Sequence, residues 1–469
     1  MTAVILILII IGYVLIATRA WNHINKAAIA VFIGVAAWLL YILNGFQYAK
    51  SEHADELTSY FLSTAGDTFS IKEFISSHIF VNYITQACEV VLFLLATIGI
   101  AEVLNGNKCF NFVCDMIRSR KSKNIMWALV AVTFIISANL DNLTTTVMML
   151  VIMHKIVSGT KLRMIYGAAI AIAANCGGAL TVIGDINGLT LWTRGFITPS
   201  MYSLVMAVPV ITMTVVTTWL IGRMLPEKIT IPSQYDFQIS DDSALTKWQR
   251  NTLLVIGIGG LWFIPTFHNL TGLPPYVGAL CVLSLLWVVN EIFNLPFIRS
   301  GKMVIHHFPI AVQYENIQAI LFYIGITLIA GVCIEIGTIE KLSLWIMQNA
   351  DNVYILSALW GIVSIVLDSV IIIINNANLC SVESWQIISR SASFGQNGAF
   401  WPLLNYFCLF GCTLLTIGTV GGIMLMRMEN VSLAWYIRRI TPKVAIGGIA
   451  GTITILIITT LLYNLSDFC

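Results

Sequence analysis

Six carboxylates lie within stretches of the sequence that are apolar enough to cross a membrane. They are Glu89, Glu102, Asp141, Asp185, Glu335 and Asp368. Asp141 and Asp368 each follow a leucine at matching places in the two halves of the chain. A carboxylate in hydrocarbon costs at least about 2.5 to 3.5 kcal/mol, so it is retained where water, an ion or a partner group meets it. The pattern predicts a membrane carrier for a small ion.

The composition indicates an all-α polytopic membrane protein in contact with lipid. Of the 469 residues, 58% are hydrophobic and 10% are charged, and the mean hydropathy is +0.86. Runs of about 20 apolar residues recur, which is the length that a membrane-spanning helix needs. The net charge of +2 indicates no nucleic-acid partner. We expect a transporter and not an enzyme, with no resident cofactor.

The cysteines and the first apolar stretch have simple interpretations. The ten cysteines are scattered, and only Cys109 and Cys114 share a polar loop. With no Cys-x-x-Cys pair and no nearby histidine, inert thiols are favoured over a zinc site. Residues 2–18 have no basic segment before them, and Arg19 and Lys26 follow them. This order predicts a retained first span and not a cleaved signal peptide.

Hydropathy predicts ten membrane crossings. They lie near residues 2–18, 27–44, 82–104, 163–192, 203–222, 251–266, 274–294, 316–338, 401–426 and 443–463. Two further apolar segments, near 125–157 and 352–384, are interrupted by polar clusters. Backbone that leaves the helix at membrane depth is tolerated only where protein or a cavity surrounds it. We therefore expect these two segments to be re-entrant hairpins whose tips reach the midplane.

The basic residues predict the orientation of the chain. With residue 1 outside and ten crossings, all but five of the 25 Lys and Arg residues lie on the cytoplasmic side. The five outside are Lys50, Lys72, Arg194, Lys341 and Arg390. This excess agrees with the positive-inside rule. We expect both termini outside, in a bacterial inner (cell) membrane.

The two halves of the chain share a pattern. Leu92-Phe93-Leu94 precedes Asp141 by about the distance at which Leu321-Phe322-Tyr323 precedes Asp368. Five crossings and one hairpin per half is an odd number of crossings, which predicts an inverted repeat. The first repeat is expected over 1–222 with a broken helix at 163–192, and the second over 251–469 with a broken helix at 401–426. A cytoplasmic linker, 223–250, joins them, and an external acidic loop with a surface helix occupies 45–78.

Polar side chains gather at the hairpin tips and at the helix breaks. The candidate ion-binding residues are Ser137, Asn139, Asp141, Asn142, Thr144, Thr145, Asn175, Thr181, Asp185, Asn187, Asp368, Ser369, Thr413 and Thr419. Oxygen-only groups with one or two carboxylates suit a hard cation such as Na⁺. The alternative is that these polar groups only hydrogen-bond between helices. We expect Na⁺ to be bound at Asp141, Asn142, Asn175 and Asp185.

These residues also carry a family resemblance. The stretches 134–145, 173–179 and 183–185, with Asp141 and Asp185, resemble the NhaD-type sodium/proton antiporters of the ion transporter superfamily, which also holds citrate and dicarboxylate carriers and arsenite permeases. The resemblance runs from about residue 80 to 460. It implies an elevator-type carrier in which a transport domain of hairpins and broken helices slides against a scaffold. It also implies a homodimer.

The second half departs from the family pattern. Family members usually carry Asp-Asn-Val-Pro at the second hairpin, where this chain has Asp368-Ser369-Val370-Ile371. The family's Gly-Thr-Gly-Gly-Ser stretch corresponds to Leu409-Phe410-Gly411-Cys412-Thr413. We expect the first-half cation site to persist and the second to be degraded or altered, with Asn375, Asn376 and Asn378 as substitute ligands or as simple inter-helix hydrogen bonders.

Three functional classes remain open. The leading prediction is Na⁺/H⁺ antiport, with Li⁺ as a further cation, in which Asp141 and Asp185 bind either cation or proton. Glu89 and Glu335 are candidates for the proton path. The alternative is Na⁺-coupled uptake of citrate or another di- or tricarboxylate. Two features disfavour it: an Asp at each hairpin tip, and the expected lack of any Lys or Arg in mid-span. A non-transporting membrane sensor is the third class.

Overall fold

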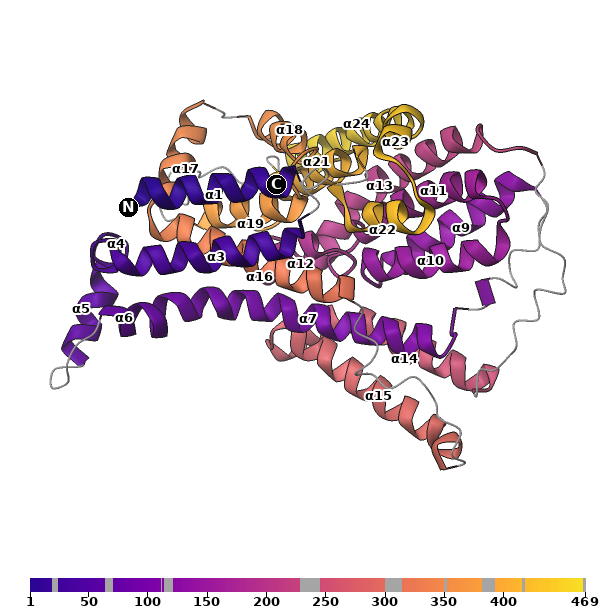
Figure 1. Ribbon diagram of the computed structural model, residues 1–469, viewed down its shortest axis with the longest axis horizontal. Helices are drawn as coiled ribbons and strands as arrows, with labels where there is room; N and C mark the ends of the chain where they lie inside the picture. Colours follow the sequence, from indigo (N-terminus) through magenta and orange to yellow (C-terminus); the bar gives the residue numbers. More distant parts are fainter. Residues whose placement is uncertain are drawn as a thin grey trace.

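The computed structural model of the chain is an assembly of helices (Figure 1). It describes residues 1–18, 24–63, 71–110, 112–113, 121–227, 245–299, 314–349, 352–381, 393–415 and 418–466. Most of the predicted linker, 223–250, and the last residues of the second hairpin segment lie outside the described residues. So does Cys114, the expected loop neighbour of Cys109.

The helices of the first half follow the hydropathy pattern. They are α1 (Thr2–Ala17), α3 (Lys26–Leu43), α4 (Gly45–Glu52), α5 (Ala54–Ser63), α6 (Ile71–Phe74), a π-helical turn (Ile75–Phe80), α7 (Val81–Gly106), α9 (Ser122–Ser137), α10 (Asn142–Ile156), α11 (Thr160–Gly178), α12 (Ile186–Thr193) and α13 (Pro199–Gly222). The expected helix of the acidic loop is thus present as α4 and α5.

The second half has a similar order of elements. They are α14 (Lys247–Thr271), α15 (Pro275–Arg299), α16 (Tyr314–Glu335), α17 (Thr338–Asn349), α18 (Val353–Val363), α19 (Ser369–Ser381), α21 (Phe400–Leu414), α22 (Val420–Glu429), α23 (Leu433–Arg439) and α24 (Thr441–Ser466). Thr246 starts α14 with a capping box, because its side chain accepts from Gln249 N while the Gln249 side chain accepts from Thr246 N.

Seven helices in the described residues are long and apolar enough to span a membrane. They are Lys26–Leu43, Ile71–Gly106, Pro199–Gly222, Lys247–Thr271, Pro275–Leu295, Asn316–Glu335 and Thr441–Leu462. Each coincides with an expected crossing. Of the other three expected crossings, 2–18 is the 16-residue helix α1. The segments 163–192 and 401–426 are each divided into two shorter helices, α11 with α12 and α21 with α22.

The outward face of these helices is apolar. On α14, Trp248, Val255 and Trp262 are each at least 69% exposed. Only 22% of the 18-residue apolar stretch of α14 is buried inside the protein, against 72% for the corresponding stretch of the span that contains α7. Large exposed apolar surfaces are unusual in soluble monomers and are expected where lipid covers the protein. The structure is therefore that of a multi-pass membrane protein.

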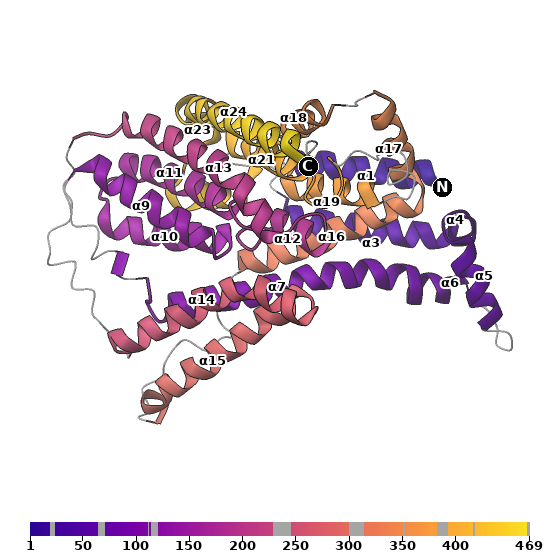
Figure 2. The ribbon, with the colours of Figure 1, turned by 180° about the vertical axis from the view of Figure 1, so that it is seen from behind.

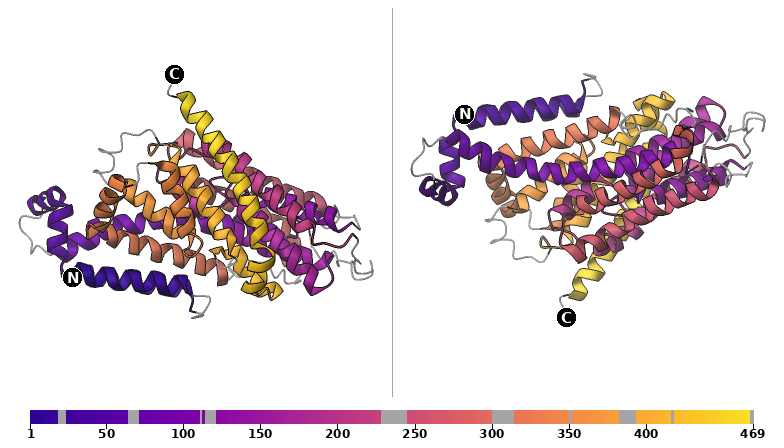
Figure 3. Two further views of the ribbon diagram at one scale, coloured as in Figure 1. Left: turned by 90° about the horizontal axis from the view of Figure 1, so that it is seen from above. Right: turned by 90° about the horizontal axis from the view of Figure 1, so that it is seen from below.

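The interior brings distant segments together. Helix α3 packs along α16, and α13 packs along α24. Helices α14 and α15 pack against α7 on one side of the assembly, away from α24 (Figure 2). Seen from above, α24 lies obliquely across the other helices (Figure 3). The buried core includes large side chains from both halves, among them Tyr166, Tyr323 and Trp401.

Two interrupted helix pairs occupy the expected hairpin positions. In the first, α9 and α10 pack against each other across the turn 138–141. In the second, α18 and α19 are separated by 364–368, and both arms pack on α21, while α19 also packs on α16, α12 and α17. The two hairpins thus differ, because the arms of the first pack on each other whereas the arms of the second pack mainly on other helices.

Candidate functional site

Three aspartates and one threonine stand at the start of the four half-helices that follow the polar interruptions. Asp141 is the N-cap of α10, Asp185 is the N-cap of α12, and Thr419 is the N-cap of α22. Asp368 immediately precedes α19, and its Oδ1 accepts from Val370 N at 3.2 Å. The amide ends of helices favour negative charge, so the three starts that carry an aspartate stabilise its carboxylate. The short polar clusters thus end one helix and begin the next.

Asp141 lies at the tip of the first hairpin with part of its carboxylate unpartnered. Its Oδ2 accepts a hydrogen bond from Thr144 N at 2.9 Å. Within the described residues, Asp141 Oδ1 and Thr145 Oγ1 are buried without a hydrogen-bond partner. Burying a charged or polar oxygen without a partner is costly. The tip therefore has oxygen atoms that a small cation or a proton would satisfy.

The tip of the first hairpin packs closely on the break between α11 and α12. Ser137 Oγ donates to Ala174 O at 2.7 Å, and Thr181 Oγ1 donates to Ala138 O at 2.6 Å. A Cβ at Gly177 would lie 2.3 Å from Phe134 O, and one at Gly184 would lie 2.6 Å from Ser137 O. Only glycine allows the two backbones to approach this closely. The hydroxyls of Ser137 and Thr181 therefore join the two segments.

Two hydrogen bonds connect the polar residues of the two halves. Asn175 Nδ2 on α11 donates to Thr419 Oγ1 at 3.1 Å, and Asn187 Nδ2 on α12 donates to Ser369 Oγ at 3.0 Å. The Oδ1 atoms of both asparagines are buried without a hydrogen-bond partner in the described part of the chain. The two halves therefore contribute to one polar centre.

Asp185 is near both hairpin-tip carboxylates. It is close enough to interact electrostatically with both Asp368 and Asp141. Among the described residues, neither Asp141 nor Asp185 forms an ion pair. Asn142 lies beside the break, because its Cβ would be 3.4 Å from a Cβ at Gly178. The structure thus brings Asp141, Asn142, Asn175 and Asp185 into one region, and their role in binding Na⁺ stays a prediction.

The carboxylate of the second hairpin has a basic partner. Lys26 Nζ, at the start of α3, lies 2.5 Å from Asp368 Oδ2. The same ammonium lies 4.1 Å from the centre of the Phe322 ring on α16. The two charged side chains are only 11% and 12% exposed. We expected no Lys or Arg in mid-span, and Lys26 is the first residue of α3, from where its side chain reaches the tip of the second hairpin.

The asparagines of α19 form hydrogen bonds, and Asn376 Oδ1 is buried without a hydrogen-bond partner among the described residues, so their role as substitute ligands stays a prediction. Asn375 Nδ2 and Asn376 Nδ2 donate to carbonyls of their own helix, at 2.7 and 2.9 Å. Asn378 Oδ1 accepts from Arg194 Nη1 at 2.5 Å. These contacts agree with the simpler alternative, in which the three side chains form hydrogen bonds within and between helices.

Three other predicted residues have different surroundings. Asn139 donates to Ile135 O and accepts from Trp262 Nε1 of α14, so its amide is engaged away from Asp141. Thr413 Oγ1 donates to Leu409 O at 2.6 Å within its own helix. Glu89 lies in the middle of α7 and interacts electrostatically with Arg194. The proton-path role of Glu89 and the ion-binding roles of Asn139 and Thr413 stay predictions.

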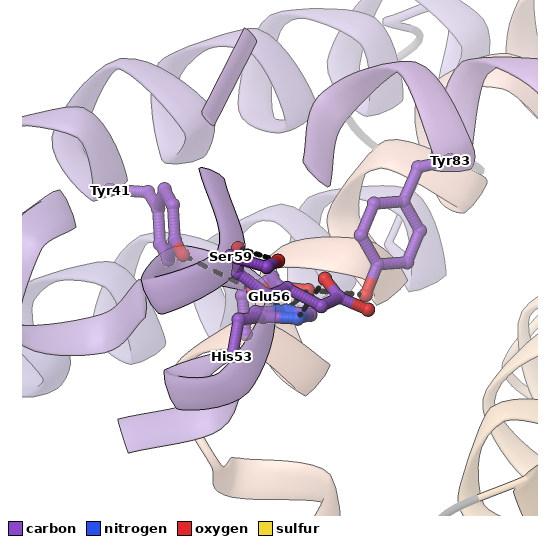
Figure 4. Close-up of polar contacts among 6 residues, drawn as sticks. Tyr41, His53, Glu56, Ser59 and Tyr83 are labelled. Atoms are coloured by element: carbon purple, nitrogen blue, oxygen red, sulfur yellow. Dashed lines mark hydrogen bonds and ion pairs between the residues drawn. The ribbon is translucent and has the colours of Figure 1, made fainter. Parts of the chain in front are cut away.

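Glu335 lies at the end of α16 in a separate polar cluster, of which Figure 4 labels Tyr41, His53 and Tyr83. Its carboxylate accepts from Tyr83 Oη at 2.7 Å and from Tyr41 Oη at 3.1 Å, and it pairs with His53 Nε2 at 3.0 Å. His53 also contacts the exposed Glu56 at 3.2 Å. The hydrogen bond to Glu335 raises the pKa of His53, although partial burial opposes the rise. The cluster links a buried carboxylate to a group at the surface.

Several engaged side chains were not predicted as site residues. Lys26 and Arg194 contact the second hairpin, and Glu429 of α22 pairs with His154 and lies 3.4 Å from Arg163 Nε. Tyr202 donates to Ala179 O in the first break and accepts from Asn405 Nδ2. A charged residue beside an apolar stretch is the signal for Lys26 and Glu429, but their partners are far apart in sequence. Among the described residues, no three His, Cys, Asp or Glu side chains group as a metal site.

Comparisons with known proteins agree with a transport role. The model of the citrate transporter family (CitMHS) matches residues 6–377. "Sodium/proton antiporter 2" of Arabidopsis thaliana is 27% identical over 456 residues, covering 95% of this chain and 97% of the relative. "Sodium/proton antiporter 1" of the same plant is 31% identical over 378 residues, covering 78% of this chain and 61% of the relative. The "Na(+)/H(+) antiporter NhaD" of Vibrio parahaemolyticus is 23% identical over 438 residues, covering 88% of this chain and 96% of the relative.

Proposed function

Because the chain belongs to the citrate transporter family and is a relative of NhaD-type antiporters, we propose that it exchanges Na⁺ for H⁺ across a membrane. The observation that carries the proposal is the set of buried oxygens on Asp141, Thr145 and Asn175 that have no hydrogen-bond partner among the described residues. Such oxygens match the ligand preference of a hard cation. Li⁺, which has the same charge and chemistry, is a second substrate.

The exchange uses the carboxylates of Asp141 and Asp185. A buried carboxylate needs a compensating charge, which either Na⁺ or a proton supplies. When Na⁺ leaves, a proton takes its place, so that the net charge of the site is the same whichever ligand it holds. Asn142 and Asn175 add neutral oxygen ligands beside the two carboxylates. Competition between the two ligands at one place couples the two fluxes.

The carrier operates by alternating access, with the hairpins and broken helices as the moving part of an inverted repeat. The four half-helices that begin at the polar centre support this proposal, because interrupted helices at a central site are the usual architecture of secondary transporters. The excess of basic residues on one side of the membrane supports an orientation with both termini outside. A homodimer in a bacterial cell membrane is the expected assembly.

The surroundings of the carboxylates favour antiport over citrate symport. A di- or tricarboxylate substrate would meet three aspartates in the polar centre, and like charges repel. The basic side chains that reach the second hairpin are engaged, Lys26 with Asp368 and Arg194 with Asn378. An anion site needs cationic or amide donors directed at the substrate. The name of the family model nevertheless makes citrate the right competitor to test.

Transport into membrane vesicles separates the three classes. Vesicles that contain the chain are loaded with a pH dye, and NaCl, choline chloride or NaCl with labelled citrate is added. Antiport predicts a proton flux that needs Na⁺ and does not need citrate. Citrate accumulation that needs Na⁺ would instead establish symport. Vesicles that show neither flux, although the chain is inserted, would support the sensor.

A further inference from the structure

The two hairpin tips satisfy their aspartates in different ways. Asp141 Oδ2 accepts from a backbone amide, and its Oδ1 has no hydrogen-bond partner in the part of the chain that the structure describes. Asp368 Oδ1 also accepts from a backbone amide, but its Oδ2 meets the ammonium of Lys26 at 2.5 Å. The two aspartates occupy the same position in the two halves. The carboxylate of Asp141 needs a positive charge, whereas that of Asp368 already has one.

The surroundings of Lys26 are those of a resident ion. The ammonium lies between the Asp368 carboxylate and the face of Phe322, whose side chain is 3% exposed. An aromatic face attracts a cation, most strongly where both are shielded from water. Asn25 caps the start of α3 by accepting from Ala27 N, which fixes the backbone that presents Lys26. The lysine is thus held against the second tip by an ion pair, a ring and an ordered helix start.

We propose that the Lys26 ammonium takes the place of a second transported cation at Asp368, so that the carrier binds one Na⁺ per chain. This inference rests on the proposed Na⁺/H⁺ exchange and assigns its cation stoichiometry. Asp141 and Asp185 then hold the one exchangeable site.

Removing the ammonium exposes the carboxylate of Asp368. A buried charge that loses its partner is unfavourable until another cation neutralises it. Lys26→Met keeps an unbranched side chain of similar length and removes the charge. This variant is therefore expected to bind a second Na⁺ at Asp368. Removing both charges, in Lys26→Met with Asp368→Asn, removes the need for that second ion and returns the carrier to one.

The test measures equilibrium binding of ²²Na⁺ to the purified full chain and the Na⁺ dependence of proton flux in vesicles. The wild type should bind about one Na⁺ per chain, and Lys26→Met should bind about two. The double variant should return to the wild-type values and retain exchange. Lys50→Met, on the exposed surface of α4, controls for the loss of a lysine charge elsewhere.

Three results would overturn the inference: two Na⁺ bound by the wild type, one Na⁺ bound by Lys26→Met, or loss of exchange in the double variant. If Lys26→Met does not fold, the wild type and the double variant still decide, because both must bind one Na⁺. Asp368→Asn alone should reduce exchange less than Asp141→Asn. A wild type without Na⁺-driven proton flux would contradict the proposed function itself, which is a different result from a wild type that exchanges two cations.

Discussion

Asn187 of α12 donates a hydrogen bond of 3.0 Å to Ser369 at the start of α19. The helix break of the first half is thereby joined to the hairpin of the second half, 182 positions away in the sequence. Both side chains are buried. The helix break of the first half and the tip of the second hairpin are therefore in direct contact.

The link predicts a coupling energy between the two residues. Ser369→Ala and Asn187→Ala should each lower the stability of the folded chain by about 1 kcal/mol, because each removes one buried hydrogen bond. The double variant should lose clearly less than the sum of the two, since residues in contact are not additive. Thermal unfolding in detergent measures the three values. Additive losses would show that the two side chains do not interact.

Asp141→Asn and Asp185→Asn should each abolish Na⁺/H⁺ exchange while leaving membrane insertion intact. Each change keeps the shape of the side chain but removes the group that binds a cation or a proton, and a neutral amide enters hydrocarbon more easily than a carboxylate. Proton flux in vesicles is compared at matched expression. Thr133→Val on the same hairpin is the control, because Thr133 Oγ1 donates only to Leu129 O of its own helix among the described contacts. Exchange that persists in either Asn variant would exclude that residue from the coupling step.

The His53–Glu335 pair predicts a pH dependence of stability. The pKa of His53 is raised in the folded chain because it pairs with Glu335. Because this pKa is higher in the folded chain, the pair stabilises the fold fully below about pH 6.5, the ordinary pKa of histidine. The stabilisation is lost as the pH rises through the pKa of His53 in the folded chain. The wild type should therefore lose thermal stability over this interval. His53→Gln should remove this component of the pH profile, whereas an unchanged profile would contradict the pairing.

Close packing of the first tip predicts intolerance of a methyl group. Gly177→Ala would place a Cβ 2.3 Å from Phe134 O, so α9 and α11 must separate. Such overpacking costs about 1 to 3 kcal/mol and should displace Ser137 and Asp141 with it. Gly259→Ala on α14 is the matched control, because nothing lies within 4 Å of its Cβ. Unfolding temperature and exchange should both fall for Gly177→Ala and remain near wild type for Gly259→Ala.

The positions of the helices could be predicted from the sequence better than the contacts between them. Apolar runs located spans such as α13 and α24 to within a few residues, because burial in lipid depends on local hydropathy. Gly177, Gly178 and the polar residues around Asp185 predicted the helix break, since glycine and clustered polar groups interrupt helices locally. The local sequence thus predicted where these helices lie and where they end.

Contacts between distant residues could not be predicted in the same way. Lys26 and Asp368 are 342 positions apart, and each alone resembles a residue at the edge of a span. The same holds for His53 and Glu335, which are 282 positions apart. Pairing of this kind depends on how α3 and α4 pack against α16, which no local pattern encodes. The resemblance pointed to the first tip because its polar residues are close in sequence. It did not predict that Lys26 is the partner of Asp368 at the second tip.

The most direct test of Na⁺/H⁺ exchange is ²²Na⁺ uptake into proteoliposomes that contain only the purified chain. With the interior more acidic than the medium, we predict that ²²Na⁺ accumulates without citrate and that a protonophore and a permeant counter-ion, added to collapse the proton gradient, abolish the accumulation. Asp141→Asn proteoliposomes should show neither. Uptake that survives collapse of the proton gradient, or that begins only when citrate is added, would contradict the account.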